Sequence, residues 1–354
     1  EERTSSHRRT GEIRTKVLIP CSSRFLRYRI AASCRLSVKK EHLHTEELAK
    51  FAQRCSFLVL PGLLKKGTDT IMKNIQDNYV LSNGVKIPCV GFGTYRQPNN
   101  SSTVDIIKTA IDCGYRHIDT AYGYDNEEAV GKAIRECGLP REELFITSKL
   151  SNDNHGYEKT VKEFEITMNN LGTPYLDLYL IHWPKPLKYR EHWQEANEGT
   201  WKAFEEFYNA GKIKAIGVSN FLEEHLEALL ETATIAPMVN QIELHPQYVQ
   251  RDIVQYCKEH RIIVEAWSPL IKGSAMAHPV LVKIAKNHNK TPAQILLGWS
   301  IQHNFLPLPK ASSKERILEN ADIFDFKLSD NEIEELKILE ALGRTGSHPD
   351  TATF

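Results

Sequence analysis

The sequence lacks the features that mark several large classes of protein. The 354-residue chain has 45 Lys and Arg residues against 45 Asp and Glu residues, so the basic excess of nucleic-acid-binding domains is missing. It also has no run of about 20 apolar residues, the length that a membrane-spanning helix needs. The most apolar run, residues 55–64, is interrupted by Pro61 and Gly62. We therefore expect neither nucleic acid nor membrane among the partners of this chain.

Cysteine motifs are missing as well. The seven cysteines form no C-x-x-C pair, which argues against a zinc or redox-dithiol site. Their odd number and wide scatter argue against a disulfide framework. We expect no metal site, and the composition favours a soluble, cytoplasmic protein. The cysteines are Cys21, Cys34, Cys55, Cys89, Cys113, Cys137 and Cys257.

The zero net charge hides a division between residues 1–71 and the rest. Residues 1–71 hold 15 basic and 7 acidic residues, and the remaining 283 residues hold 30 and 38. An acid-poor leader rich in Arg and Ser is typical of an organelle transit peptide, but Glu1 begins the chain and Met72 is its first methionine. We favour a disordered leader or non-native upstream sequence over targeting, and we expect residues 72–354 to form the folded domain.

From residue 78 onward, short apolar runs alternate with amphipathic stretches. Asn83-Gly84 between two β-prone runs predicts a hairpin with a type I′ turn. The eight following pairs of strand and helix, in about 235 residues, favour a (β/α)8 barrel. A doubly wound sheet is the alternative, weakened because residues 91–96 lack the third glycine of G-x-G-x-x-G. The expected strands are 90–94, 117–121, 144–150, 176–183, 215–219, 239–244, 262–267 and 306–309. The expected helices include 104–113, 127–137, 158–171, 198–210, 223–230, 252–260, 279–287 and 314–321.

Four polar residues stand where the expected strands end. Asp119, Lys149 and His182 close three of these strands, and Tyr124 lies in the loop after the second. In a parallel barrel such positions meet at the C-terminal rim, where barrel enzymes keep their active sites. Each residue alone has an ordinary structural explanation, such as a helix cap or a solvated lysine. Together they place an anion, a cation, an imidazole and a phenol at one rim, which favours a catalytic site.

This set of side chains suits proton transfer to a carbonyl group. A phenol has a pKa of about 10 and is a weak acid at pH 7. A nearby ammonium group lowers that pKa, provided that a carboxylate holds the ammonium in place. A neutral imidazole can orient the substrate oxygen. General acid catalysis of this kind contributes a rate enhancement of about 100- to 10,000-fold.

Several long motifs resemble those of the aldo-keto reductases, in the expected order from about residue 79 to the C-terminus. The matching segments are 114–131, containing Gly114-Tyr115-Arg116-His117-Ile118-Asp119, then Ile181-His182-Trp183-Pro184, 217–221, 240–246 and 309–320. The resemblance implies a (β/α)8 barrel capped below by the N-terminal hairpin. It also implies hydride transfer from NADPH to an aldehyde or ketone.

The resemblance further implies roles for individual residues. Tyr124 would be the general acid, Lys149 and Asp119 its pKa-lowering partners, and His182 the residue that orients the substrate. Ser219, Asn220 and Gln241 would bind the nicotinamide carboxamide, and Trp267 would stack on its ring. The remaining implied cofactor contacts are Gly93, Thr94, Asp119, Ser268, Leu270, Lys310, Ser312, Arg316, Glu319 and Asn320.

The choice between NADPH and NADH depends on the last of these segments. A 2′-phosphate favours charge-assisted bonds from Lys and Arg, which Lys310 and Arg316 can supply at the start of the last expected helix. The family commonly has Ser after the lysine, and this chain has Ala311 there. Ser312 or Ser313 must then replace that hydrogen bond. We expect NADPH to be preferred, with less discrimination than a complete motif would give.

The substrate is indicated less directly. By resemblance, Tyr95 and Trp183 line an aromatic mouth, and the short tail 343–354 is similar to bacterial-type members such as 2,5-diketogluconate and methylglyoxal reductases. We expect small dicarbonyls, aldehydes and keto sugars as substrates and a monomeric protein. A cofactor-sensing module, as in the potassium-channel β subunits, is the alternative from another functional class, and alcohol oxidation is the alternative direction of the reaction.

Overall fold

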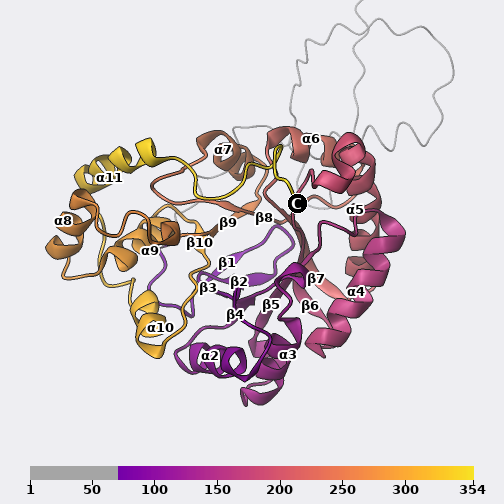
Figure 1. Ribbon diagram of the computed structural model, residues 1–354, viewed down its shortest axis with the longest axis horizontal. Helices are drawn as coiled ribbons and strands as arrows, with labels where there is room; N and C mark the ends of the chain where they lie inside the picture. Colours follow the sequence, from indigo (N-terminus) through magenta and orange to yellow (C-terminus); the bar gives the residue numbers. More distant parts are fainter. Residues whose placement is uncertain (1–70) are drawn as a thin grey trace, which may run out of the picture. The chain divides into compact units, whose positions relative to one another are not determined.

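The computed structural model describes residues 71–354 (Figure 1). The predictions for residues 1–71 lie outside this part, apart from Ile71, and stay predictions. Within residues 71–354 no helix has both the length and the apolar character required to cross a membrane. Four cysteines of this part are free thiols, namely Cys89, Cys113, Cys137 and Cys257.

Eight parallel strands form the centre of the fold, in the order β10-β9-β8-β7-β6-β5-β4-β3. The two end strands meet, because the Gly93 N–H donates a hydrogen bond of 3.1 Å to the Pro309 carbonyl. The predicted barrel is thereby confirmed, and the alternative of an open doubly wound sheet is wrong. The strands are β3 (Gly91–Gly93), β4 (His117–Asp119), β5 (Phe145–Leu150), β6 (Leu176–Ile181), β7 (Ile213–Ser219), β8 (Val239–Glu243), β9 (Ile263–Trp267) and β10 (Leu306–Pro307).

Helices surround the strands, as Figure 1 shows. Each helix packs an apolar face on the barrel, because apolar residues spaced three or four apart lie on one side of it. Val104, Ile107 and Ile111 of α2 are an example, and all three are buried. The expected helices are confirmed within a few residues, except that α5 begins five residues earlier. The helices are α2 (Ser101–Asp112), α3 (Glu127–Glu136), α4 (Tyr157–Leu171), α5 (Trp193–Asn209), α6 (Glu223–Thr232), α7 (Arg251–Glu259), α8 (Pro279–Asn287), α9 (Pro292–Gln302), α10 (Lys314–Ala321) and α11 (Asp330–Leu336).

Helix α9 was not among the expected helices. It is apolar on nearly all sides, and the residues from Gln294 to Ile301 are all buried, so it has no amphipathic period that would reveal it. Its start is nevertheless encoded. The Thr291 hydroxyl accepts from the Gln294 N–H at 3.3 Å, and the Gln294 side chain accepts from the Thr291 N–H at 2.9 Å. This capping box, with Pro292 in the first turn, is a signal that the sequence carries.

The predicted hairpin is present, but its turn is of another type. Strands β1 (Asn78–Val80) and β2 (Lys86–Pro88) pair with Tyr79 opposite Ile87. Only Gly84 has a positive φ, of 89°, whereas Asn83 does not. A type I′ turn would need both, so that prediction is wrong. The chain instead makes a turn closed by the Gly84 N–H on the Leu81 carbonyl at 2.9 Å, followed by a bulge at glycine.

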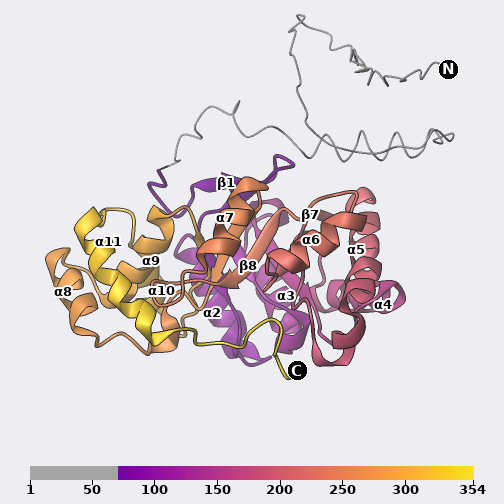
Figure 2. The same cartoon turned by 90° about the horizontal axis from the view of Figure 1, so that it is seen from above.

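The hairpin closes one end of the barrel. The Asn83 amide donates to the Lys214 carbonyl at 2.9 Å, near the start of β7, and the Tyr79 hydroxyl donates to the Phe305 carbonyl, just before β10. Figure 2 shows β1 at this end and the C-terminal segment at the opposite one. The opposite rim, where the parallel strands end, is therefore the one left free for a site.

One glycine sits where two helices approach closely. Gly131 of α3 faces the C-terminal end of α4, and a Cβ atom there would lie 2.6 Å from the carbonyl carbon of Leu171. The obstacle is backbone, which cannot rotate away as a side chain can. The approach of α3 to α4 therefore depends on the missing methyl group.

We expect Gly131→Ala to lower the free energy of unfolding by about 2 kcal/mol, because overpacking outweighs the better helix propensity of alanine. Urea unfolding measures it. Gly123→Ala is the matched control, since no heavy atom lies within 4 Å of the Cβ position at Gly123. Equal stability of the two variants would contradict the close approach.

Candidate active site

The structure brings the four predicted catalytic residues together at the open rim. Asp119 ends β4, Lys149 is the penultimate residue of β5, and His182 follows β6. Tyr124 ends a short 3-10 turn, η1 (Tyr122–Tyr124). Parallel pairing puts the ends of β4, β5 and β6 side by side, so residues distant in the sequence share one site.

Lys149 is the hub of this group. Its ammonium nitrogen lies 2.8 Å from both Asp119 carboxylate oxygens, 2.8 Å from the Thr120 carbonyl and 3.2 Å from the Tyr124 hydroxyl oxygen. The three ammonium protons match these three acceptor groups. Because the Tyr124 oxygen accepts one of them, its own O–H remains free to donate elsewhere.

The pKa of Tyr124 differs from the expectation. Burial raises the pKa of the phenol, Lys149 lowers it, and the Asp119 charge raises it, so that the net direction is upward. The prediction that Asp119 helps to lower the pKa of the phenol is therefore wrong for its direct effect. The negative charge of Asp119 raises that pKa and partly cancels the effect of Lys149. Burial lowers the pKa of Lys149, but Asp119 and Tyr124 raise it more. At pH 7 the phenol is protonated and the amine is charged, the states that a proton donor and its stabilising cation need.

His182 is a neutral imidazole. Burial, with Lys149 and His155 adding to it, holds the pKa of His182 well below its usual range. Its ring lies edge-on to the Tyr124 ring, with the centroids 5.6 Å apart. The neutral state agrees with the expectation from the sequence. The ring can therefore orient a carbonyl oxygen beside the phenol without adding a second cation.

Aromatic residues flank these groups, as expected for the mouth. Tyr95 is 53% exposed and its ring centroid lies 5.0 Å from that of Tyr124. Trp183 is buried and packs edge-on against Phe354, 5.0 Å away. The Leu187 N–H donates to the Phe354 carbonyl at 3.0 Å, so the C-terminal residue forms part of the wall.

The residues predicted for the nicotinamide end gather on the neighbouring strand ends. Ser219 ends β7, Gln241 is in β8 and Trp267 ends β9. The Asn220 amide donates to the His182 carbonyl at 2.9 Å and accepts from the Trp267 indole N–H at 2.8 Å. Asn220 thus links the histidine loop to the predicted stacking residue. Ser268 and Leu270 follow β9 directly, at the same rim.

Two further predicted cofactor residues lie at the end of β3: Gly93 is its last residue, and Thr94 follows it. The Gly93 N–H bonds to Pro309, as described above, and the Thr94 hydroxyl donates to the Asp119 carbonyl at 2.9 Å. Both residues are buried. The Thr94 bond supports the backbone at Asp119, and with it the position of the carboxylate that pairs with Lys149.

The residues predicted for the 2′-phosphate lie at the N-terminus of α10. Lys310, Ser312 and Arg316 are exposed there. The Ser313 hydroxyl caps the helix by accepting from the Arg316 N–H at 3.4 Å, so Ser312 is the hydroxyl left to replace the missing serine at position 311. Glu319 and Asn320, on the same helix, differ in setting. Glu319 accepts from the Thr291 hydroxyl at 2.5 Å, and Asn320 is buried.

A residue with no role predicted from the sequence holds the Tyr124 loop in place. Asn126 is fully buried, and its amide donates to the Thr94 and Gln97 carbonyls at 2.9 and 3.0 Å. Its oxygen accepts from the Thr120 hydroxyl at 2.8 Å. Asn126 stands at the N-cap position of α3, but its side chain makes no capping bond. Its position between Tyr124 and the start of α3 is the one feature of the sequence that could have indicated this role.

Comparison with known proteins agrees with this geometry. The profile of the aldo/keto reductase family matches residues 89–341. The chain belongs to the aldo/keto reductase family. It is accordingly an oxidoreductase that acts on carbonyl groups with NADP(H).

The chain aligns with nearly the whole length of its most informative relatives. The glyoxal reductase of Bacillus subtilis is 47% identical over 281 residues, which are 79% of this chain and 99% of the relative. The methylglyoxal reductase DkgA of Escherichia coli is 40% identical over 273 residues, 76% of this chain and 96% of the relative. A crystal structure of Gox0644 in complex with NADPH is 38% identical, has a TM-score of 0.73, and covers 79% of this chain and 99% of that one.

The C-terminal tail of this aldo/keto reductase is held by side chains rather than by secondary structure. The Glu243 carboxylate accepts from the Thr345 N–H at 2.5 Å and from the Gly346 N–H at 3.1 Å. Farther along, Asp350 lies 3.1 Å from the His225 Nε2 atom and 2.8 Å from the Lys185 ammonium. These two anchors fix the tail beside the mouth.

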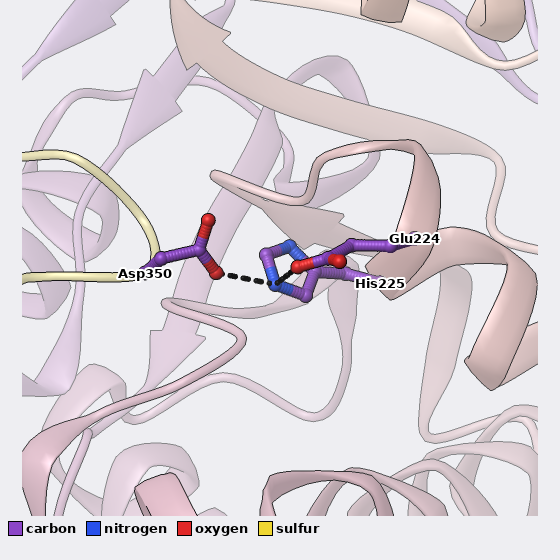
Figure 3. Close-up of side chains that lie close together, drawn as sticks. All are labelled: Glu224, His225 and Asp350. Carbon is purple, nitrogen blue, oxygen red and sulfur yellow. Dashed lines mark hydrogen bonds and ion pairs between the residues drawn. The ribbon is translucent and has the colours of Figure 1, made fainter.

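The second anchor has the side-chain types of a metal site, as Figure 3 shows for Glu224, His225 and Asp350. Its hydrogen bonds indicate an ion-pair clasp instead. The His225 Nδ1 atom accepts from the Leu222 N–H at 3.0 Å, so the neutral ring carries its proton on Nε2 and donates it to Asp350. The Lys185 ammonium already supplies the cation between the two carboxylates.

We expect Lys149→Met to lower the free energy of unfolding by about 3 to 5 kcal/mol, because the buried Asp119 carboxylate loses its cation. The double variant with Asp119→Asn should recover part of this loss, since neither charge remains. Urea unfolding of both single variants and the double variant closes the cycle. Losses that simply add would contradict the coupling of the pair.

Proposed function

We propose that this aldo/keto reductase reduces aldehydes and ketones, chiefly small dicarbonyls and keto sugars, with NADPH as hydride donor and Tyr124 as general acid. One observation carries the proposal. The Lys149 ammonium bonds to the Tyr124 oxygen at 3.2 Å, which leaves the phenolic hydrogen for a substrate at the open rim.

The chain offers groups that fit NADPH. Exposed Lys310 and Arg316 lie at the N-terminus of α10, where their charges and the positive end of the helix dipole suit a phosphate. Asn220, Gln241 and Trp267 offer amide and aromatic groups at the other end. When bound, NADPH supplies a hydride from C4 of its nicotinamide to the carbonyl carbon.

The residues of the chain handle the proton. Tyr124 donates its hydroxyl proton to the carbonyl oxygen as negative charge develops there, and Lys149 stabilises the phenolate that remains. Asp119 keeps Lys149 in place through two contacts of 2.8 Å. His182, being neutral, orients the carbonyl oxygen next to the phenol.

The substrate class follows from the wall of the site and from the relatives. Tyr95, Trp183 and Phe354 leave a mouth bordered by aromatic rings. Relatives named for glyoxal and methylglyoxal reduction support small dicarbonyls. A cytoplasmic monomer is proposed with this function, from the scattered cysteines and the family resemblance.

We expect Tyr124→Phe to lower kcat for methylglyoxal reduction by at least about 100-fold, since the proton donor is removed. The binding of NADPH, measured by protein fluorescence, should change little. Tyr122→Phe, in the same turn, is the matched control and should keep its activity. NADPH oxidation at 340 nm measures the rates.

A panel of substrates tests the proposed class in the same assay. Methylglyoxal, glyoxal and diketogluconate should be reduced with higher kcat/KM than steroid ketones, and the reverse order would overturn the substrate class. A normal rate for Tyr124→Phe would remove the general acid. Cofactor binding without turnover of any carbonyl by the wild type would favour the sensing module.

The cofactor preference has its own test. We expect Arg316→Ala to weaken NADPH binding by about 10- to 100-fold, the value of a charge-assisted hydrogen bond, and to leave NADH binding nearly unchanged. Lys314→Ala, on the same helix, serves as control for the loss of one positive charge. Equal losses for NADPH and NADH would refute the phosphate role of Arg316.

A further inference from the structure

A further ionisable side chain lies next to the four catalytic residues, and no step above uses it. Glu265 is in the middle of β9, is fully buried, and lies opposite Gln241 of β8 and Leu306 of β10. Its Oε2 atom accepts a hydrogen bond of 2.7 Å from the Gln241 amide nitrogen. The same nitrogen donates to Asp119 Oδ2 at 2.9 Å.

These bonds form a continuous series from Glu265 to the phenol. The Gln241 amide nitrogen donates to the carboxyl groups of both Glu265 and Asp119. Asp119 in turn binds Lys149, and Lys149 binds Tyr124. The amide cannot rotate without losing both bonds. Glu265 thus fixes the orientation of Gln241 and one side of Asp119.

Among the described residues around Glu265, no cation is available to pair with a second carboxylate beside Asp119. Glu265 is faced by Asp119 and His117 from β4, by Lys149 from β5 and by Gln241 from β8, while β10 contributes the apolar Leu306. The ammonium of Lys149 is engaged by Asp119. Burial, with Lys149 adding to it, lowers the pKa of His117 to about 3, so that imidazole is neutral.

The contacts of the carboxyl group agree with this. Among the described residues no hydrogen-bond donor reaches Glu265 Oε1, and His117 Nε2 is 3.9 Å away from it. Burial raises the pKa of Glu265 to about 8, and the Asp119 charge contributes to the rise. At pH 7 the group is therefore a neutral acid, which accepts from Gln241 without adding charge.

We propose that Glu265 is a positioning residue for the proton donor Tyr124. Glu265 holds Gln241 against Asp119, and in its protonated form it leaves Asp119 as the one negative charge beside the Lys149–Tyr124 pair. The proposal rests on the proposed function, in which Tyr124 is the acid. Loss of the Glu265 proton would place a second negative charge beside Asp119. That charge would raise the pKa of Tyr124 and weaken its proton donation.

The test is the pH profile of Glu265→Gln, measured as kcat for methylglyoxal with saturating NADPH from pH 6 to 10. The amide oxygen can still accept from Gln241, so activity at pH 7 should stay within about threefold of the wild type. The wild-type kcat should begin to fall near pH 8, and the variant should fall at least about one pH unit later, because an amide does not titrate. Superimposed profiles would overturn the proposal.

A second variant separates positioning from charge. Glu265→Leu fills the space but offers no acceptor to Gln241, so we expect kcat to fall about tenfold or more at every pH. A Leu variant as active as the Gln variant would show that Gln241 needs no acceptor at this position, and would overturn the positioning role.

A stability measurement tests the protonation state without any assay of activity. A carboxyl group with a pKa of about 8 in the fold and an ordinary value of 4.5 when unfolded binds its proton only in the native state between these pH values. Wild-type stability should therefore fall relative to Glu265→Gln as pH rises from 5 to 8, and the difference should be constant above pH 8. A constant difference between pH 5 and 8 would show an ionised Glu265 and overturn the proposal.

Glu243→Gln is the matched control for this measurement. Burial raises the pKa of Glu243, but hydrogen bonds from His245 and Thr345 lower it more, and the net direction is downward. Its stability difference from the wild type should not change between pH 5 and 8. Failure of Tyr124→Phe to reduce turnover would count against the proposed function, whereas failure of the Glu265 tests alone would leave that function in place.

Discussion

The buried ion pair between Lys149 and Asp119 is the constraint on which the site depends. An ammonium group inside a barrel is tolerated only with a carboxylate at bonding distance. Two neighbouring strands supply this pair: β4 ends with Asp119 opposite Thr147, and β5 continues past that point to Lys149 and Leu150. The pair then sets the charge of its surroundings. His182 and His117 stay neutral beside the cation. The Tyr124 oxygen accepts a hydrogen bond from the Lys149 ammonium, and this bond sets the direction in which its own hydroxyl can donate.

The barrel divides its two ends between structure and chemistry. Below, the hairpin of β1 and β2 covers the strand starts and bonds to backbone carbonyls near β7 and β10. Above, the strand ends present the polar groups, and the C-terminal tail forms one wall through the contact of Phe354 with Trp183. Because parallel strands all end at the same side, a few polar substitutions at strand ends suffice to assemble a site from distant parts of the chain.

The sequence predicted what depends on local pattern and failed where tertiary context decides. The strands and the group of Asp119, Tyr124, Lys149 and His182 followed from apolar runs that end in polar residues. Helix α9 has no polar face that would reveal it in the sequence. Asn83-Gly84 is compatible with two turn types, and the pairing of the strands decides which one forms. Glu265 appears in the sequence as one acid within an apolar run. Whether it points into the barrel or out of it depends on the register of β9, which no local pattern reveals.

The way in which the tail is fastened has an evolutionary consequence. Its two fixed points, Thr345–Gly346 on Glu243 and Asp350 on His225 and Lys185, are polar contacts that do not involve Tyr124, Lys149 or Asp119. The residues between and after those points can therefore diverge among descendants of this chain while the reaction chemistry is inherited intact. Such separation lets selection change which substrates the enzyme accepts by exchanging tail residues outside the two anchors, at little cost to the reaction chemistry.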